Sequence, residues 1–308
     1  MLLARAQIPL HLSGFWVPII NQDPLASGSL GAGLTLYPPA LLSIYVHGQD
    51  MCNTMVNGKC FDFSNHLRSI ERFLGVRGRG VGIKCYSRGE LGEGLGLSAA
   101  LSIAYAIGLL VKSGASISLN KAGTAAHYAE VVNMTGLGDV IAEIRGGGLV
   151  ARVSPGPPGV GDIDSFPIRE RVRVAVTSVG SLTTPKMLVE GLHKQFVEGF
   201  KAYENFIRNP SLESFLINAY TFSRRTGMLS SSLDEALKDK LKGLIGSGCV
   251  LGYFVKKSLL AIIHNASCEE EVLSELKDLG TIKLLTPYHA GTWVLYDHGL
   301  GTEGTPKV

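Results

Sequence analysis

The sequence has little charge for its length: 18% of its 308 residues are charged, whereas 45% are hydrophobic. Disordered chains combine low hydrophobicity with high charge, so this composition excludes intrinsic disorder. The formal net charge is only +3, which does not suggest the concentrated basic surface of nucleic-acid-binding proteins. We therefore expect a folded protein that does not bind nucleic acid.

The sequence also lacks a long apolar run. The longest such stretch, residues 95–111, is interrupted by Ser98, Ser102 and Gly108, and it is shorter than the about 20 residues that a membrane-spanning helix needs. The N-terminus has no basic segment followed by a long apolar one, so no signal peptide is expected. These absences favour a cytoplasmic protein that does not associate with membranes.

Cysteine is scarce, and its spacing follows no known framework. The five residues are odd in number and form no Cys-x-x-Cys pair, a pattern that argues against both a disulfide scaffold and a zinc site. A reducing compartment is therefore the simplest expectation. The cysteines are Cys52, Cys60, Cys85, Cys249 and Cys268.

Glycine, by contrast, is abundant. The chain has 38 glycines in 308 residues, well above the about 7% of an average protein. They follow no collagen period but cluster at 28–33, 75–82, 89–96, 136–148 and 156–161. Clustered glycine indicates tight turns or a backbone that approaches a ligand closely.

Hydrophobic periodicity predicts a mixture of strands and helices along the whole chain. We expect an α+β protein of two domains, 1–165 and 166–308, joined at the proline- and glycine-rich segment 154–162. Asn120 is the expected N-cap of one helix. The expected strands are 2–8, 33–36, 43–46, 81–86, 149–153, 171–179, 280–285 and 293–296, and the expected helices are 61–74, 97–111, 120–133, 184–207, 210–226, 231–244 and 250–263.

The most informative segment runs from Arg88 to Ala100, where a strand, a glycine loop and an alanine-rich helix follow one another. The amides of such a loop and the positive end of the helix dipole together favour an anion. Ser98 lies in the first turn of that helix, where its hydroxyl can meet a phosphate or a phosphate-bound metal. No lysine precedes the serine, so this is not the GxxxxGK[ST] loop, and a dinucleotide-binding fingerprint is only weakly matched.

Two acidic residues downstream fit the same chemistry. A phosphate loop without lysine needs a metal to neutralise charge, and magnesium prefers one or two carboxylates together with phosphate and water oxygens. Ser98 and Glu130 supply such ligands. Asp139, in the second glycine loop, can accept the proton of a substrate hydroxyl as a general base.

These motifs resemble the GHMP small-molecule kinase superfamily. Residues 94–99 match its Gly-Leu-Gly-Ser-Ser-Ala loop, except that Leu97 replaces the first serine and Glu90 stands where the motif has proline. The resemblance implies a two-domain fold, with a ribosomal protein S5 domain 2-like ATP-binding domain and a ferredoxin-like α/β domain. It also implies ATP and Mg²⁺, with Ser98 and Glu130 as metal ligands and Asp139 facing the substrate hydroxyl. The ATP-binding residues would be Gly92, Glu93, Gly94, Leu95, Gly96, Leu97 and Ser98.

Within the superfamily the sequence is most similar to the archaeal pantoate kinase family. Four stretches carry the similarity: 9–16, 23–33, 126–131 and 135–159. It covers residues 5–160 well and the C-terminal third poorly. The resemblance implies ATP-dependent phosphorylation of pantoate at its 4-hydroxyl in coenzyme A biosynthesis, and it suggests a homodimer.

Pantoate requires a cation for its carboxylate, polar groups for its hydroxyls and an apolar wall for its two methyl groups. Arg152 can pair with the carboxylate, with Arg145 as a rival nearer to Asp139 in sequence. His127 shares a helix face with Glu130. Ser29 can hydrogen-bond substrate oxygens, and His11 is expected on the substrate side. Asn53, Asn57 and Asn65 are equivalent candidates for the adenine.

Three alternatives remain open on the sequence. The acceptor could be homoserine, mevalonate or a sugar, as in other GHMP kinases. The fold could serve a non-catalytic nucleotide sensor, for which the two departures in the loop give some support. The third alternative is a glycine-rich nucleotide-binding module of unrelated fold.

Overall fold

The computed structural model describes residues 1–46, 52–76, 80–179 and 184–296. The described strands are β1 (Leu2–Ile19), β2 (Gly28–Val46), β3 (Thr54–Val56), β4 (Lys59–Cys60), β5 (Val81–Tyr86), β6 (Leu149–Ser154), β7 (Asp162–Phe166), β8 (Val172–Ser178), β9 (Val250–Lys256), β10 (Leu259–Asn265), β11 (Lys283–Pro287) and β12 (Trp293–Leu295). The described helices are α1 (Ser64–Leu74), α2 (Leu97–Lys112), α3 (Leu119–Val132), α4 (Asp139–Arg145), α5 (Thr184–Arg208), α6 (Leu212–Thr226), α7 (Ser231–Gly246) and α8 (Glu269–Leu276), with short 3₁₀ turns at Ala266–Cys268 and Lys277–Leu279.

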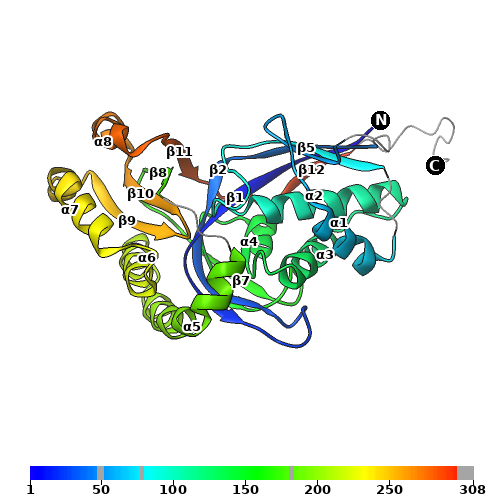
Figure 1. Cartoon of the computed structure of the whole chain (residues 1–308), viewed down its shortest axis with the longest axis horizontal. Coiled ribbons are helices and arrows are strands. Elements are labelled where there is room, and N and C mark those ends of the chain that lie inside the picture. The colour runs from blue at the N-terminus through cyan, green and yellow to red at the C-terminus, as the bar shows by residue number, and fades with distance from the viewer. Residues whose placement is uncertain (47–51, 77–79, 180–183, 297–308) are drawn as a thin grey trace, which may run out of the picture.

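The strands join in one sheet whose main path is β4-β3-β5-β2-β11-β8-β10-β9. Two long antiparallel strands, β1 and β2, run through the middle of the molecule, where three short strands were expected (Figure 1). Their pairing shifts register at three points. Such bulges let a paired strand bend without ending, which is why residues such as Pro38 and Gly14 do not stop these strands.

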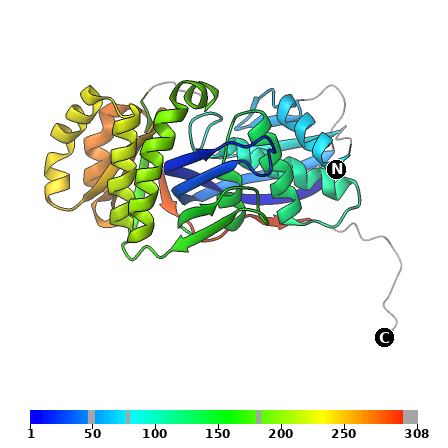
Figure 2. The same cartoon turned by 90° about the horizontal axis from the view of Figure 1, so that it is seen from below.

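Helices α1 to α4 pack together at one end of the sheet, and α5 to α8 lie at the other (Figure 1, Figure 2). Helix α2 is buried on nearly all sides, as its continuous apolar sequence predicts. The second half of β1 is also buried on both faces. There Phe15 packs on Phe206 of α5 and Phe215 of α6, so the central ribbon is held by helices from the C-terminal half.

Most of the expected elements are present, but three are corrected. Residues 250–263, expected as a helix, form the antiparallel hairpin of β9 and β10, because two short apolar runs flank the polar Lys256-Lys257-Ser258 segment. Ser118 rather than Asn120 caps α3, accepting a hydrogen bond from the Lys121 amide. Asp139, expected within the second glycine loop, begins helix α4.

The proline-rich segment expected as a linker connects β6 to its antiparallel neighbour β7. The chain later returns to the N-terminal half, where β12 pairs with β1. The division of the chain after residue 165 stays a prediction. Of the 75–82 glycines, Gly75 ends α1 in a left-handed conformation, whereas Gly78 lies outside the described residues.

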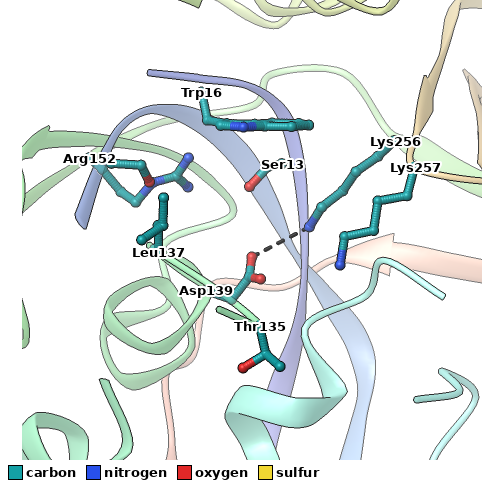
Figure 3. A pocket seen from close by; sticks show the side chains of 11 residues that line it. Ser13, Trp16, Thr135, Leu137, Asp139, Arg152, Lys256 and Lys257 are labelled. Atoms are coloured by element: carbon teal, nitrogen blue, oxygen red, sulfur yellow. Dashed lines mark hydrogen bonds and ion pairs between the residues drawn. The ribbon is translucent and has the colours of Figure 1, made fainter. Parts of the chain in front are cut away.

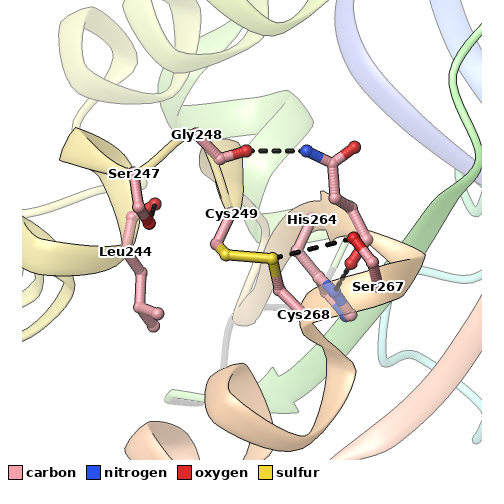
Figure 4. Close-up of a disulfide and its surroundings, with 8 residues drawn as sticks. Leu244, Ser247, Gly248, Cys249, His264, Ser267 and Cys268 are labelled. Carbon is pink, nitrogen blue, oxygen red and sulfur yellow. Dashed lines mark hydrogen bonds between the residues drawn. A yellow bond between two sulfur atoms is a disulfide. The ribbon is translucent and has the colours of Figure 1, made fainter.

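The expectation that the cysteines form no disulfide framework is wrong. Cys52 pairs with Cys60, and Cys249 pairs with Cys268 (Figure 4), while Cys85 is free and buried. The second bond joins the residue just before β9 to a residue just after β10, so it closes the base of that hairpin. Neither pairing follows a sequence motif. The two cysteines of each pair are 8 and 19 residues apart, and they come together only because the chain between them turns back as a hairpin.

The Cys249–Cys268 bond should stabilise the fold. A disulfide between residues 19 positions apart stabilises the folded state by about 3 kcal/mol, because it restricts the unfolded chain. Cys249→Ser should therefore lower the free energy of unfolding by about that amount in urea titrations. Cys268→Ser should cause the same loss, and the double variant no more, because either change breaks the bond. A wild-type unfolding curve that dithiothreitol leaves unchanged would contradict this prediction.

Candidate active site

A pocket of about 400 Å³ lies where β1, the start of α4, β6 and the tip of the β9–β10 hairpin meet (Figure 3). Polar and charged side chains contribute to its lining, and Trp16 and Leu137 supply apolar surface. Six of its residues were expected to bind substrate or to belong to the second glycine loop (Ser29, Gly136, Leu137, Gly138, Asp139 and Arg152), but its two lysines were not. Its lining is Ser13, Trp16, Ser29, Thr135, Gly136, Leu137, Gly138, Asp139, Arg152, Lys256 and Lys257.

Asp139 reaches the pocket from the first turn of α4. Its Oδ1 lies 2.7 Å from His11 Nδ1 and 3.4 Å from Lys256 Nζ. Burial alone would raise the pKa of this carboxyl, but the Lys256 ammonium and the hydrogen bond from His11 hold the pKa well below its usual range. Asp139 is therefore a carboxylate at neutral pH, fixed in orientation by two neighbours.

His11 connects Asp139 to Arg152. Its ring is fully buried, and burial lowers its pKa to about 4 despite the neighbouring Asp139. The imidazole is thus neutral at pH 7. With Nδ1–H donating to Asp139, the other nitrogen accepts from Arg152 Nη1 at 3.4 Å. His11, predicted as a substrate contact, lies behind the Asp139 side chain and holds it in place.

Arg152 extends from β6 toward the same pocket. It is 1% exposed, and its Nε donates to Ser29 Oγ at 3.1 Å. Burial lowers its pKa to about 10, partly offset by Asp139, so the guanidinium stays charged at pH 7. A Cβ atom at Gly138 would lie 2.5 Å from the Arg152 side chain and from Ser29 Oγ, so only glycine allows this approach. The rival Arg145 is exposed on α4 and is absent from the lining.

A second pocket, of about 770 Å³, adjoins the first along the glycine loop. The two pockets share Thr135, Asp139 and Lys257. The loop contributes Gly92, Gly94, Gly96, Leu97 and Ser98, and the opposite side is lined by Asp62, Phe63 and His66. The arrangement gives a loop of backbone amides next to a pocket with a buried arginine, with a carboxylate between them.

Ser98 and Glu130 lie together at this second pocket. Ser98 Oγ donates to Glu130 Oε2 at 2.9 Å, and the other carboxylate oxygen contacts Ser102 and His66. Glu130 is 1% exposed. A hydroxyl and a carboxylate side by side at the glycine loop form a donor set that fits Mg²⁺, whose remaining ligands would be phosphate and water oxygens.

Four other candidate residues line neither pocket and contact other parts of the protein. His127 lines neither pocket, and its Nε2 lies 3.0 Å from the Ser27 carbonyl oxygen. Glu93 makes an ion pair with Lys283 at 2.6 Å, while the buried Leu95 uses its carbonyl to accept the His11 amide. Of the adenine candidates, Asn57 hydrogen-bonds Ser87. These contacts are internal to the protein.

Lys256 and Lys257 are the site residues that sequence reasoning missed. They lie at the tip of the β9–β10 hairpin, which was expected to be a helix. Lys256 is 4% exposed and pairs with Asp139, whereas Lys257 lines both pockets. The signal that could have found them is two short apolar runs separated by a polar turn, which is typical of a hairpin.

Glu143 is a buried carboxyl one turn after Asp139. It is fully buried, and neither oxygen has a hydrogen-bond partner. A Cβ at Gly96 would lie 2.0 Å from Glu143 Oε1, so this carboxyl occupies the space that a side chain at Gly96 in the glycine loop would need. Burial first, and then the nearby Asp139 and Glu130, raise its pKa well above the usual range.

Glu143 should therefore make stability fall as pH rises. The folded state holds this proton to a higher pH than the unfolded chain does, so the stability contributed by the protonated carboxyl is lost progressively as the pH rises above about 4.5. Glu143→Gln removes this titration. In urea titrations the variant should gain stability relative to wild type from pH 5 to 7. A difference that stays constant over this range would show that Glu143 is ionised in the fold.

Comparison with known proteins supports the expected relationship. The chain is 29% identical to the pantoate kinase of Thermococcus kodakarensis, over 95% of this chain and 100% of that protein. It is 26% identical to the pantoate kinase of Methanocaldococcus jannaschii, over 88% and 96%. No protein-family model matches the chain.

Solved structures give the fold. A protein described as a phosphotransferase related to the coenzyme A biosynthesis pathway superposes with a TM-score of 0.81 at 26% identity, covering 97% of this chain and 100% of that one. A putative homoserine kinase from Listeria monocytogenes superposes at 0.58 and 13% identity, over 96% and 100%. This chain has the GHMP kinase fold. Its resemblance to archaeal pantoate kinases, expected from four sequence stretches, is confirmed. Within the described residues of this GHMP-fold chain, no helix is long and apolar enough to cross a membrane.

Proposed function

We propose that this protein is a small-molecule kinase that transfers the γ-phosphoryl group of ATP to the 4-hydroxyl of pantoate. The observation that carries the proposal is the pair of adjoining pockets, one lined by the glycine loop and one by buried Arg152, with Asp139 common to both. The similarity to proteins named pantoate kinase supports this acceptor.

ATP would place its phosphates over residues 92–98, against the loop amides and the N-terminus of α2. Mg²⁺ would be held by Ser98 and Glu130, and it would neutralise phosphate charge there. One structure of the same fold at 10% identity is described as a complex with AMPPCP and magnesium, and this supports the pair of cofactors for the fold. Most of the acceleration in phosphoryl transfer comes from positioning and charge neutralisation.

Pantoate fits the first pocket by its chemistry. Arg152 would bind the carboxylate, because a planar guanidinium matches a carboxylate bidentately. Ser29, already hydrogen-bonded to Arg152, would contact a substrate oxygen. Trp16 and Leu137 would cover the two methyl groups. The hydroxyl to be phosphorylated would then face Asp139 and the second pocket.

Asp139 would first hold that hydroxyl and then accept its proton. A carboxylate whose pKa is lowered is a weak base, so it does not ionise the hydroxyl in advance. As the oxygen bonds to phosphorus the hydroxyl becomes strongly acidic, and the proton then moves to Asp139. His11, neutral and hydrogen-bonded on both sides, would keep the carboxylate aimed at the hydroxyl.

An acceptor panel tests the proposal. We expect ATP consumption with pantoate and Mg²⁺, and little or none with homoserine, mevalonate or galactose at equal concentration. Activity with another acceptor alone would make the protein a different GHMP kinase. Tight ATP binding without turnover on any acceptor would favour a nucleotide sensor instead.

The metal ligands have a test of their own. Ser98→Ala and Glu130→Gln should each lower kcat by about 10-fold or more and shift the Mg²⁺ concentration for half-maximal rate upward, because each removes an oxygen ligand. Ser113→Ala is the matched serine control, since Ser113 lies at the far end of α2. Unchanged magnesium dependence in both variants would remove these residues from the metal site.

A further inference from the structure

We infer that Lys257 is a catalytic residue that binds the phosphoryl group during its transfer. The inference rests on the proposed function and adds to it a cation that the glycine loop lacks. It starts from the hairpin tip of β9 and β10, which brings Lys257 from the C-terminal half of the chain into the pocket of Figure 3, and the same residue also lines the glycine-loop pocket.

The first argument is position. A phosphoryl group in transfer must pass from the glycine-loop pocket to the pocket of Arg152, so residues that line both pockets touch the reacting atoms. Those residues are Thr135, Asp139 and Lys257. Lys257 carries the only positive charge among these three. It therefore lies where the negative charge of the transferring group is greatest.

The second argument is that the glycine loop has no cation of its own. Residues 89–98 contain no lysine or arginine. Lys257, from the hairpin tip, lines the glycine-loop pocket. The γ-phosphate would therefore meet its ammonium group as well as the Mg²⁺ that Ser98 and Glu130 would hold.

The third argument is the backbone that aims the side chain. Neighbouring residues of a strand point to opposite faces, yet Figure 3 shows Lys256 and Lys257 reaching into the same pocket. Lys257 has a positive φ of 57°, and its amide donates to Met228 Sδ at 3.3 Å. This left-handed backbone conformation costs energy in residues other than glycine, asparagine and aspartate. It also sets the direction in which the Lys257 side chain leaves the turn.

The step balances without a further reactant. The 4-hydroxyl oxygen of pantoate bonds to the γ-phosphorus while the bond from that phosphorus to the β,γ-bridging oxygen breaks, and its electron pair leaves with ADP. The hydroxyl proton goes to Asp139. Lys257 donates hydrogen bonds to the non-bridging oxygens and keeps its own protons. Burial, and then Lys256, lower its pKa to about 8, so most of it is charged at pH 7.

Lys257→Met tests the inference, because methionine keeps the length of the side chain and removes its charge. We expect kcat to fall by 10²-fold or more, the size of effect seen when one donor to a transition-state oxyanion is removed. The KM for pantoate should change less than fivefold. Lys84→Met, on the exposed face of β5, is the matched control and should keep wild-type kcat.

A second variant restores the charge. Lys257→Cys treated with 2-bromoethylamine regains an ammonium of nearly the same length, while the free Cys85 is buried. We expect at least 10-fold recovery of kcat after treatment. Lys257→Met that keeps more than a third of wild-type kcat, or a modified Cys variant that recovers nothing, would overturn the inference. If wild type itself fails on every acceptor, the proposed function and this inference fall together.

Discussion

Asp139→Asn should abolish turnover, with kcat at least 10³-fold below wild type, while ATP binding changes little. The asparagine can still contact the hydroxyl but cannot take its proton, and general bases contribute about 10²–10⁴-fold. Binding of a non-hydrolysable ATP analogue, followed by calorimetry, separates this effect from misfolding. The check matters because Lys256, almost fully buried, loses its carboxylate partner in the variant.

Asp164→Asn serves as the control for Asp139→Asn. It makes the same chemical change at an exposed position of β7, and it should leave kcat and analogue binding at wild-type values. If Asp139→Asn keeps near-normal turnover, Asp139 takes no part in the chemistry, and the function of the two pockets needs another explanation.

Arg152→Ala should raise the KM for pantoate by about 10²-fold and the KM for ATP by less than threefold. The guanidinium would bind the pantoate carboxylate, and a charge-assisted hydrogen bond lost from a buried site costs about 2–3 kcal/mol. Steady-state kinetics with each substrate varied in turn gives both constants. The alanine variant also removes one hydrogen-bond partner from Ser29 and one from His11, so its melting temperature should be measured alongside.

Two further variants serve as controls for the Arg152→Ala prediction. Arg152→Lys keeps the positive charge but loses the planar guanidinium that can bind a carboxylate through two hydrogen bonds. Its KM for pantoate should therefore lie between the values of wild type and Arg152→Ala. Arg145→Ala, at the exposed rival position, should change neither KM. A rise in the KM for ATP larger than that for pantoate, or a strong effect at Arg145, would place the carboxylate elsewhere.

The parts of the site that sequence could predict are those encoded within short segments. The glycine loop, Ser98 at the start of α2 and Asp139 after the second glycine cluster each belong to a local pattern. The hydrogen bond between Ser98 and Glu130 follows from two helices that pack side by side, and the resemblance to the GHMP kinases implies that the two residues lie together as metal ligands.

The missed parts depend on contacts between distant segments. Lys256 and Lys257 come from a hairpin more than 100 residues after Asp139, and the apolar runs around them suit a helix or a strand. His127 does share a helix face with Glu130, yet its ring turns to the Ser27 carbonyl. The disulfides likewise follow from the folded hairpins, since the spacing of the cysteines carries no motif.

Proton-coupled phosphorus NMR of the reaction product tests the central claim most directly. After incubation with pantoate, ATP and Mg²⁺, phosphorus on the 4-oxygen would couple to the two protons of the adjacent CH₂ group, and its signal should split into a triplet. A doublet would place the phosphate on the 2-hydroxyl, beside a single proton. A spectrum with only ATP, ADP and inorganic phosphate would contradict the assignment of this protein as a pantoate kinase.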